Sequence, residues 1–404
     1  MKSNTILFIS FLLIILFSSN VLGVEKEEAN VRDYFDSSAI GFGFGVTSLY
    51  QTNARGGLST NNQDGRYTGR YDLDLSLDLE KLIGIEGGTI FLHGWGGWPD
   101  TKGIDEKMVG SAFGINALSV GNRSMDIVEL FYEGPLFYDN LTLTIGKLDF
   151  TGIFDASEYA DDECSQFLNT SLVDDPTIPF PEQGLGFTLN WNITDSWYLL
   201  AGVADAEADG RETGFHTAFC KEDYFFYAVE TGKTLELKSN NGSMPGTYRV
   251  GFWIDDQDKE KFSDGRIRRN DTGLYTSLNQ MLYKENDNAE DSQGLGCFAR
   301  YGWADSEYNS ITNFFSVGLQ YQGIFANRDE DVCGFGYSRG FFSNKDALNY
   351  VQDYESVLES YYNLHISSSL VISPSMQYIT NPSNGEGVNI SDTLVLGLRL
   401  NMMF

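Results

Sequence analysis

Two segments of the chain alternate between apolar and polar side chains at every second position. Residues 70–80 read RYDLDLSLDLE, so tyrosine and leucines alternate with charged or polar residues. Residues 394–404 read LVLGLRLNMMF, with an apolar residue at every even position. Successive side chains of a β-strand point to opposite faces, so both segments predict strands with one consistently apolar face. A soluble antiparallel sheet also contains such strands. The number and spacing of the strands therefore decide between a soluble sheet and a membrane barrel.

Similar segments recur along the chain and predict about 16 strands, an even number typical of bacterial outer-membrane barrels. They lie near residues 40–50, 66–82, 87–96, 126–138, 141–148, 184–192, 196–204, 225–237, 246–254, 271–283, 294–304, 313–321, 331–338, 353–365, 369–378 and 392–404. Long connections tend to alternate with short ones, as residues 149–183 do with the turn at 139–140. The sequence therefore predicts an all-β fold: a transmembrane antiparallel β-barrel over residues 40–404, with long extracellular loops and short periplasmic turns.

The polar face of these strands argues against the main rival architectures. A secreted β-sandwich or propeller has shorter strands and packs its inner faces with aliphatic side chains. Here the face opposite the leucines carries Asp, Glu, Arg and glycine. That composition suits a water-filled lumen.

Charge and hydrophobicity exclude two further classes of protein. The 404 residues include 27 Lys plus Arg and 57 Asp plus Glu, a formal net charge of −30, which argues against a nucleic-acid partner. Only the first residues of the chain could form a long apolar helix, so a polytopic helical membrane protein is excluded.

The N-terminus has the features of a secretory signal. An apolar run over residues 6–17 follows Lys2, is interrupted at Ser18, and leads to a small residue at Gly23. A retained anchor helix would need about 20 apolar residues. The sequence therefore predicts a cleaved signal over residues 1–23, followed by a short periplasmic segment over residues 24–39.

Four cysteines would then reach an oxidising compartment. They are Cys164, Cys220, Cys297 and Cys333, and three pairings are possible. Their spacing fits no tight metal motif. A loop disulfide between Cys164 and Cys220 is a hypothesis at this stage.

Several stretches of residues 41–404 resemble the carbohydrate-selective porin family of the OprB type. They are YTGRYDLDLSLDLEK at 67–81, ELFY at 129–132, GKLDF at 146–150, FLN at 167–169, GLG at 184–186, residues 271–282, GIFANRDEDVCGFG at 323–336, ESYY at 359–362, PSMQYITNP at 374–382 and the VLGLRL ending. The resemblance implies a sixteen-stranded outer-membrane barrel, passive diffusion of sugars, and a constriction lined by arginines with acidic and aromatic neighbours.

The alternation also predicts which side chains face the lumen and are candidates for selecting a sugar. Arginine donates paired hydrogen bonds to hydroxyls, and aromatic faces pack against the C–H surface of a sugar ring. The pore-lining candidates are Arg66, Arg70, Asp72, His93, Trp95, Glu129, Arg249, Trp253 and Arg300. Arg66 and Arg70, with Trp95 and acidic partners such as Glu129, are expected in the narrowest section. For any one of these side chains, the alternative is a charge that only solvates the wall or pairs with a neighbour.

Residues 149–183 form the longest connection and are rich in aromatic residues and prolines. Two placements fit this composition: a loop folded into the barrel that narrows it, or a cap over the pore mouth. The sequence favours neither.

The function predicted at this stage is passive, carbohydrate-selective diffusion of small, glucose-like sugars across the outer membrane. Outer-membrane lipids are the other expected partner, and the sequence leaves monomer and trimer open. No G-x-S-x-G, H-E-x-x-H, P-loop or dinucleotide motif is present, so no enzymatic activity, cofactor or metal is expected. The alternatives are a general non-selective porin, or a barrel with an adhesive or hydrolase role.

Overall fold

The computed structural model describes residues 39–99, 103–219, 224–288, 292–345 and 349–404. The predicted signal over residues 1–23 lies outside these residues, as does the predicted periplasmic segment 24–39 except for Ala39. Both therefore remain predictions. None of the helices within the described residues is long and apolar enough to cross a membrane.

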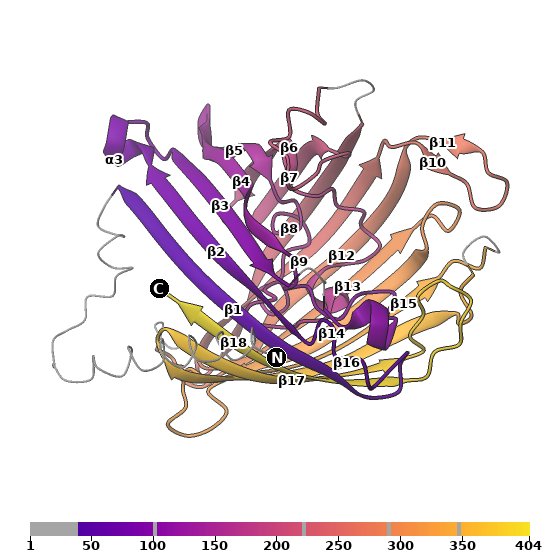
Figure 1. Cartoon of the computed structure of the whole chain (residues 1–404). Helices are drawn as coiled ribbons and strands as arrows, with labels where there is room; N and C mark the ends of the chain where they lie inside the picture. Colours follow the sequence, from indigo (N-terminus) through magenta and orange to yellow (C-terminus); the bar gives the residue numbers. More distant parts are fainter. Residues whose placement is uncertain (1–38, 100–102, 220–223, 289–291, 346–348) are drawn as a thin grey trace. The chain divides into compact units, whose positions relative to one another are not determined.

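Sixteen antiparallel strands close into one barrel (Figure 1). They are β1 (Ile40–Arg55), β2 (Tyr67–Asp78), β3 (Thr89–Trp98), β4 (Arg123–Leu136), β5 (Tyr138–Leu148), β6 (Gly184–Thr194), β7 (Trp197–Asp205), β8 (Phe225–Ser239), β9 (Gly242–Asp255), β12 (Asp271–Lys284), β13 (Gly294–Ala304), β14 (Ile311–Gln322), β15 (Val332–Phe342), β16 (Tyr354–Ser367), β17 (Leu370–Thr380) and β18 (Thr393–Met403). Each strand pairs with the next in this series, and β1 pairs with β18. The closed sheet has no free edge. The predicted fold class is confirmed.

Several short elements depart from the predicted series. The strand predicted to reach residue 82 ends at Asp78, because the Asp78 side chain accepts a hydrogen bond from the Lys81 amide and caps helix α3 (Leu79–Ile83). A small hairpin of β10 (Lys259–Glu260) and β11 (Ile267–Arg268) rises from the β9–β12 connection. Two further connections between strands contain helical turns. The β3–β4 connection contains a π-helical turn, η1 (Asp105–Val109), and the β5–β6 connection contains the short helix α4 (Thr170–Val173).

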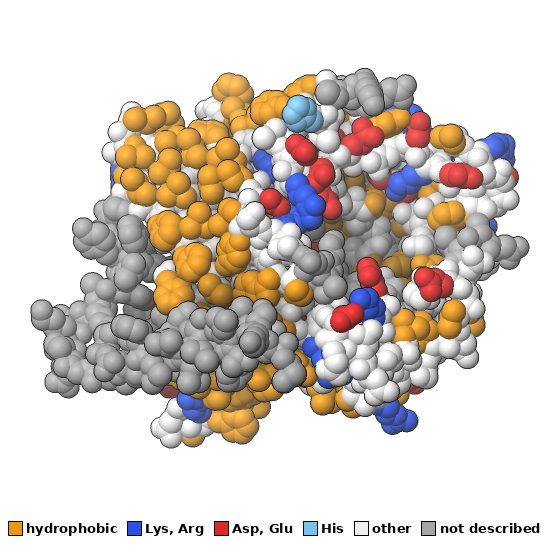
Figure 2. Space-filling view, viewed as in Figure 1, with side chains coloured by type: hydrophobic (Ala, Val, Ile, Leu, Met, Phe, Trp, Pro, Cys, Tyr) orange, Lys and Arg blue, Asp and Glu red, His pale blue; other side chains and the backbone are white. Residues whose placement is uncertain are grey.

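The two faces of the wall follow the predicted alternation. In β18, Leu396 and Leu398 are exposed on the outside, Leu398 by 50%, whereas Val395 and Arg399 point inward and are buried. Figure 2 shows the resulting field of hydrophobic side chains over the outside of the barrel, and charged side chains around the hollow. An apolar outer face and a polar inner face are what a barrel in a lipid bilayer requires.

Two long connections fold into the barrel and pack against its wall. Residues 149–183, here called the inward loop, place Phe150 and Phe154 against Phe226, Trp253 and Tyr275. Much of the inner face that was predicted to be wet is therefore covered by protein.

The second such connection comprises residues 103–122, which the sequence did not predict to fold inward. Its Ile104, Met108 and Phe113 pack against Phe314 and Val357 on the wall. The hydrophobic core of the molecule thus lies inside the barrel, between the wall and these two connections.

Glycines on the inner face permit this close packing. A Cβ at Gly336 of β15 would come within 2.8 Å of the Phe167 ring of the inward loop. A Cβ at Gly202 of β7 would come within 3.0 Å of both Phe150 and Phe154. These glycines, predicted to border water, instead make room for aromatic rings.

Candidate permeation site

A row of charged side chains crosses the inner face of β2, β3 and β4. Arg70 Nε lies 2.9 Å from an Asp72 carboxylate oxygen, and that same oxygen lies 3.3 Å from His93 Nε2. His93 Nδ1 is 3.4 Å from Glu129. Strand register explains the row, because His93 lies opposite Asp74 on one side and Glu129 on the other. Basic and acidic side chains therefore alternate and hold one another in place on this part of the wall.

Arg70 joins this wall to the inward loop. Its guanidinium pairs with Glu163, and its Nη2 donates to Cys164 Sγ at 3.0 Å. The same guanidinium lies over the Trp95 ring, 5.0 Å from the centroid. With its side chain only 7% exposed, Arg70 is held from both sides.

Cys164 carries a free thiol in this structure, and the hypothesis of a loop disulfide with Cys220 stays a prediction. Burial raises the pKa of this thiol, which therefore stays neutral at physiological pH and accepts the hydrogen bond from Arg70. Cys220 itself lies outside the described residues.

Four charged side chains of the barrel wall form hydrogen bonds with backbone groups of the inward loop. Glu359 of β16 accepts from the amides of Leu168 and Asn169 at 2.8 and 2.9 Å, where α4 begins. Arg399 of β18 donates to the carbonyls of Glu163 and Gln166 at 2.7 and 3.0 Å.

The other two anchors lie on β8 and β13. Glu230 accepts from the Asp155 amide at 2.9 Å. Arg300 donates to the Leu172 carbonyl at 2.9 Å and pairs with the Asp155 carboxylate at 3.2 Å. Hydrogen bonds to charged groups contribute about 1.5–3 kcal/mol each, so these contacts fix the path of the inward loop.

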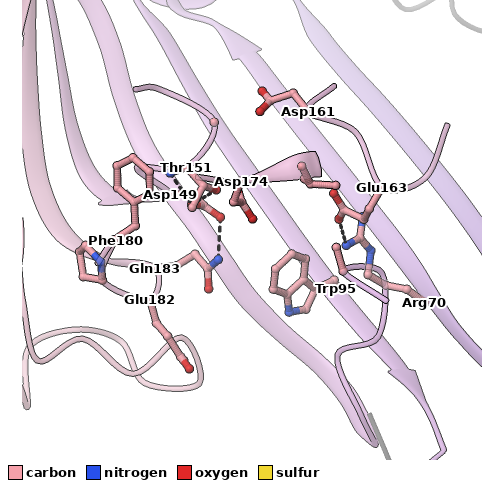
Figure 3. A pocket seen from close by; sticks show the side chains of 14 residues that line it. Arg70, Trp95, Asp149, Thr151, Asp161, Glu163, Asp174, Phe180, Glu182 and Gln183 are labelled. Carbon is pink, nitrogen blue, oxygen red and sulfur yellow. Dashed lines mark hydrogen bonds and ion pairs between the residues drawn. The ribbon is translucent and has the colours of Figure 1, made fainter. Parts of the chain in front are cut away.

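A cavity of about 320 Å³, here called the inner cavity, remains between the inward loop and the wall (Figure 3). Its lining residues are Arg70, Trp95, Ala117, Asp149, Thr151, Gly152, Asp161, Glu163, Val173, Asp174, Phe180, Pro181, Glu182 and Gln183. In Figure 3, Asp149, Asp174 and Gln183 lie between Phe180 and the pair of Trp95 and Arg70. Polar groups beside aromatic faces in a small enclosed volume are typical of small-molecule sites.

A second cavity, here called the outer cavity, has a volume of about 400 Å³. It is lined by Arg123, Glu182, Ala208, Asp209 and Arg211. Glu182 lines both cavities, so they adjoin at this side chain. Within the described residues, no group of three or more His, Cys, Asp and Glu side chains could hold a metal ion.

The structure brings together some of the predicted pore-lining residues and separates others. Arg70 and Trp95 line the inner cavity, while Asp72, His93 and Glu129 form the row on the adjacent wall. Arg66 lies outside β2 and donates to the carbonyls of Asn62 and Thr60 at 3.0 and 3.2 Å. Arg66 lines neither cavity, so the structure does not bring it together with Arg70.

Three further candidates lie on the wall farther along the chain. Arg249 faces inward on β9, opposite Ser277. Trp253 and Arg300 also point inward but are 0% and 3% exposed beneath the inward loop. The prediction that these two line the open pore needs correcting, because residues 149–183 cover them.

Sequence reasoning missed the carboxylates that the inward loop contributes: Asp149, Asp161, Glu163, Asp174 and Glu182. It also passed over Arg399, although the alternation in β18 places this residue opposite the outward leucines. The acid-rich composition of residues 149–183 was the available signal. These acids line the inner cavity because the loop folds into the barrel, and the composition does not predict that direction.

The inner cavity is expected to become more cation-selective as pH rises. Burial raises the pKa of Asp161 to about 7 and that of Asp174 to about 8. Both carboxyls therefore gain their negative charge between about pH 6 and pH 9. The reversal potential of single channels in a KCl gradient should shift toward the potassium limit over this range, and Asp174→Asn should flatten the upper part of the shift.

The same raised pKa values also determine how the stability of the inward loop changes with pH. A carboxyl whose pKa is higher in the folded state binds more protons when folded, so its contribution is complete in acid and is lost as pH rises through about 7 and 8. The inward loop should accordingly resist proteolysis best at acidic pH. A reversal potential that stays constant from pH 6 to pH 9 would contradict these assignments.

A closed antiparallel barrel with an apolar outside and a narrowed polar interior defines an outer-membrane porin. The family model for the carbohydrate-selective porin, OprB family, matches residues 62–404. The chain belongs to this family and is an outer-membrane protein that conducts sugars.

Known relatives agree with this assignment. Porin B of Pseudomonas aeruginosa is 22% identical over 387 residues, covering 85% of this chain and 83% of that protein. The high-pH structure of Pseudomonas putida OprB has a TM-score of 0.76 at 19% identity, covering 93% of this chain and 97% of that one. Its low-pH structure has a TM-score of 0.54 at 18% identity, covering 94% and 98%. The structural likeness concerns the fold.

Proposed function

We propose that small saccharides cross the outer membrane by passive diffusion through the outer and inner cavities, and that Trp95 and Arg70 are the main contacts of the sugar on the barrel wall. The observation that carries this proposal is the inner cavity itself, which places an aromatic face and hydrogen-bonding groups around a space of about 320 Å³.

Trp95 supplies the apolar part of this recognition. Its ring lines the inner cavity and is fixed by Arg70 on one side and by His93, edge-on at 5.6 Å, on the other. A sugar ring has C–H surfaces that pack against such a face. Because both neighbours hold the indole in place, little side-chain entropy is lost when a sugar binds.

The polar part comes from both walls of the inner cavity. Arg70 uses one N–H on Asp72, one on Glu163 and one on Cys164, which leaves two of its five donors for a solute. Across from it, Gln183 and Thr151 are held by Asp149 at 2.6 and 2.7 Å. Hydroxyl groups of a passing sugar would exchange water for these donors and acceptors.

Arg70→Ala and Trp95→Ala test this assignment. Loss of an aromatic or bridging contact of about 0.5–1.5 kcal/mol should weaken block of ion current by glucose about two- to tenfold. Arg70→Ala should also raise ion conductance, because it removes the bridge to Glu163. The measurement is the glucose dependence of conductance in planar bilayers, with liposome swelling by glucose, a disaccharide, an amino acid and a small anion to establish selectivity.

Arg66→Ala is the matched control, since Arg66 lies four positions from Arg70 and binds only carbonyls of its own loop among the described contacts. It should behave as the wild type. Unchanged glucose block in both Arg70→Ala and Trp95→Ala would remove these residues from the sugar path. Equal swelling rates for all solutes of similar size would indicate a general porin.

A further inference from the structure

The inner cavity is lined by five carboxylates and a single cation. The acids are Asp149, Asp161, Glu163, Asp174 and Glu182, and the cation is Arg70; Asp161 and Asp174 gain their negative charge only near pH 7 and pH 8. A passage this narrow, bounded by a low-dielectric barrel wall, concentrates solutes of the opposite charge. What matters is therefore how much of this charge is already neutralised within the protein.

The positive charge of Arg70 is fully engaged. It pairs with Asp72 at 2.9 Å and with Glu163, and its side chain is 7% exposed. Two other cations lie near the cavity, and both are covered. Lys147 Nζ donates to the carbonyls of Ile127, Gly210 and Glu212, and Arg300 pairs with Asp155. No described cation remains free to receive an anionic solute in the inner cavity.

Most of the carboxylates, in contrast, have neutral partners or none. Asp149 accepts from the Thr151 hydroxyl and the Gln183 amide, and Glu182 accepts from the Gly210 amide at 3.0 Å. The Asp174 side chain forms no hydrogen bond or ion pair with another described residue, whereas the Asp174 backbone amide donates to the Thr170 carbonyl at 2.8 Å. In Figure 3 its carboxylate lies beside that of Asp149, in the space between Phe180 and Trp95.

The outer cavity does not reverse this balance. It is lined by two arginines, Arg123 and Arg211, and by two acids, Glu182 and Asp209, and Arg123 is paired with Asp126 at 3.2 Å. A solute therefore passes from a region of balanced charge into one with net negative charge.

We propose that the passage prefers cationic saccharides, amino sugars in which an ammonium group replaces a hydroxyl, over neutral sugars of the same size, and that it disfavours sugar acids. The ammonium group would lie beside Asp149 and Glu182 while the ring packs against Trp95. This inference rests on the proposed function and adds the charge class of the solute.

The test compares three sugars that share one ring and differ in charge: glucosamine, glucose and glucuronate. Tracer uptake into liposomes containing the purified full-length protein should follow the order glucosamine, glucose, glucuronate. Uptake of glucosamine should exceed that of glucose by at least about threefold at low salt, a modest value for a charged cleft. In 1 M KCl, where the Debye length is about 3 Å, the three rates should converge.

Asp149→Asn combined with Glu182→Gln removes two charges while keeping side chains of similar shape, and should bring the three rates together at low salt. Glu86→Gln combined with Asp139→Asn is the matched control, because both acids are exposed and neither lines a cavity. This control should preserve the wild-type order.

The outcomes separate the inference from the proposed function. If glucose enters but the three rates are equal, or glucuronate is fastest, the charge preference is wrong and the sugar path stands. If the order survives in the Asp149→Asn, Glu182→Gln variant, the assignment to the inner cavity is wrong. If none of the sugars enters while KCl is conducted, the proposed function fails, and the inference fails with it.

Discussion

Replacing residues 152–180 by a short Gly-Ser linker is expected to raise single-channel conductance severalfold and to abolish its saturation by sugars. The inward loop forms most of the lining of the inner cavity, so its removal leaves the barrel wall and the second folded-in connection, residues 103–122. A short linker can close the gap, because Leu148 and Gly184 lie opposite each other in the β5–β6 pair. Conductance in planar bilayers is the measurement.

The same replacement should destabilise the barrel without opening it. Phe226, Trp253 and Tyr275 would lose the apolar surface that covers them, and each buried large side chain contributes about 1.5–3 kcal/mol. Removal of residues 258–269, which include the β10–β11 hairpin at the rim (Figure 1), is the control. That deletion should leave conductance unchanged. An unaltered conductance in the 152–180 variant would mean that the inward loop does not narrow the channel.

Arg300→Ala is expected to lower the free energy of unfolding by about 3–5 kcal/mol, the usual cost of leaving one member of a buried ion pair alone. Arg300 pairs with Asp155 at 3.2 Å beneath the inward loop, and both side chains are almost fully buried. Asp161, 3.5 Å from Arg300, is 26% exposed and can be solvated instead. Urea unfolding in detergent micelles and proteolysis of residues 149–183 would both report the loss.

The pH dependence of the Arg300→Ala variant and the stability of a double variant test the role of the Arg300–Asp155 ion pair. Burial raises the pKa of Asp155, so in the Arg300→Ala variant the loss should shrink toward acidic pH, where a protonated carboxyl needs no counter-charge. The double variant Arg300→Met, Asp155→Leu should recover most of the stability, because apolar residues of similar size remove both charges together. A single variant as stable as the wild type would show that the ion pair does not anchor the loop.

The strands could be predicted from the sequence because each lies between lipid and a polar interior. That environment imposes a period of two on segments such as residues 70–80 and 394–404. Where the alternation predicted a position wrongly, a local hydrogen bond was the cause. Asp78 caps α3 and ends β2 earlier than the leucine alternation indicates. Arg66 binds carbonyls of its own loop and so leaves the face it was predicted to share with Arg70.

The candidate site could be predicted only in part, because alternation gives the direction of a side chain and not what covers it. Arg70, Trp95, Trp253 and Arg300 all point inward, yet only the first two line the inner cavity. The difference arises from the path of residues 149–183, which is set by contacts with strands distant in the sequence, such as Leu168 with Glu359. No local pattern encodes such contacts.

The two halves of the barrel wall consequently differ in their freedom to change. From β8 through β18, inward side chains and glycines are shaped to hold the two folded-in connections, so a new residue there disturbs packing before it alters transport. The arc of β2 and β3 would contact the solute under the proposed function, and Arg70 is its main link to the inward loop. Redesign or natural divergence of solute preference should therefore concentrate on that arc and on the loop carboxylates opposite it.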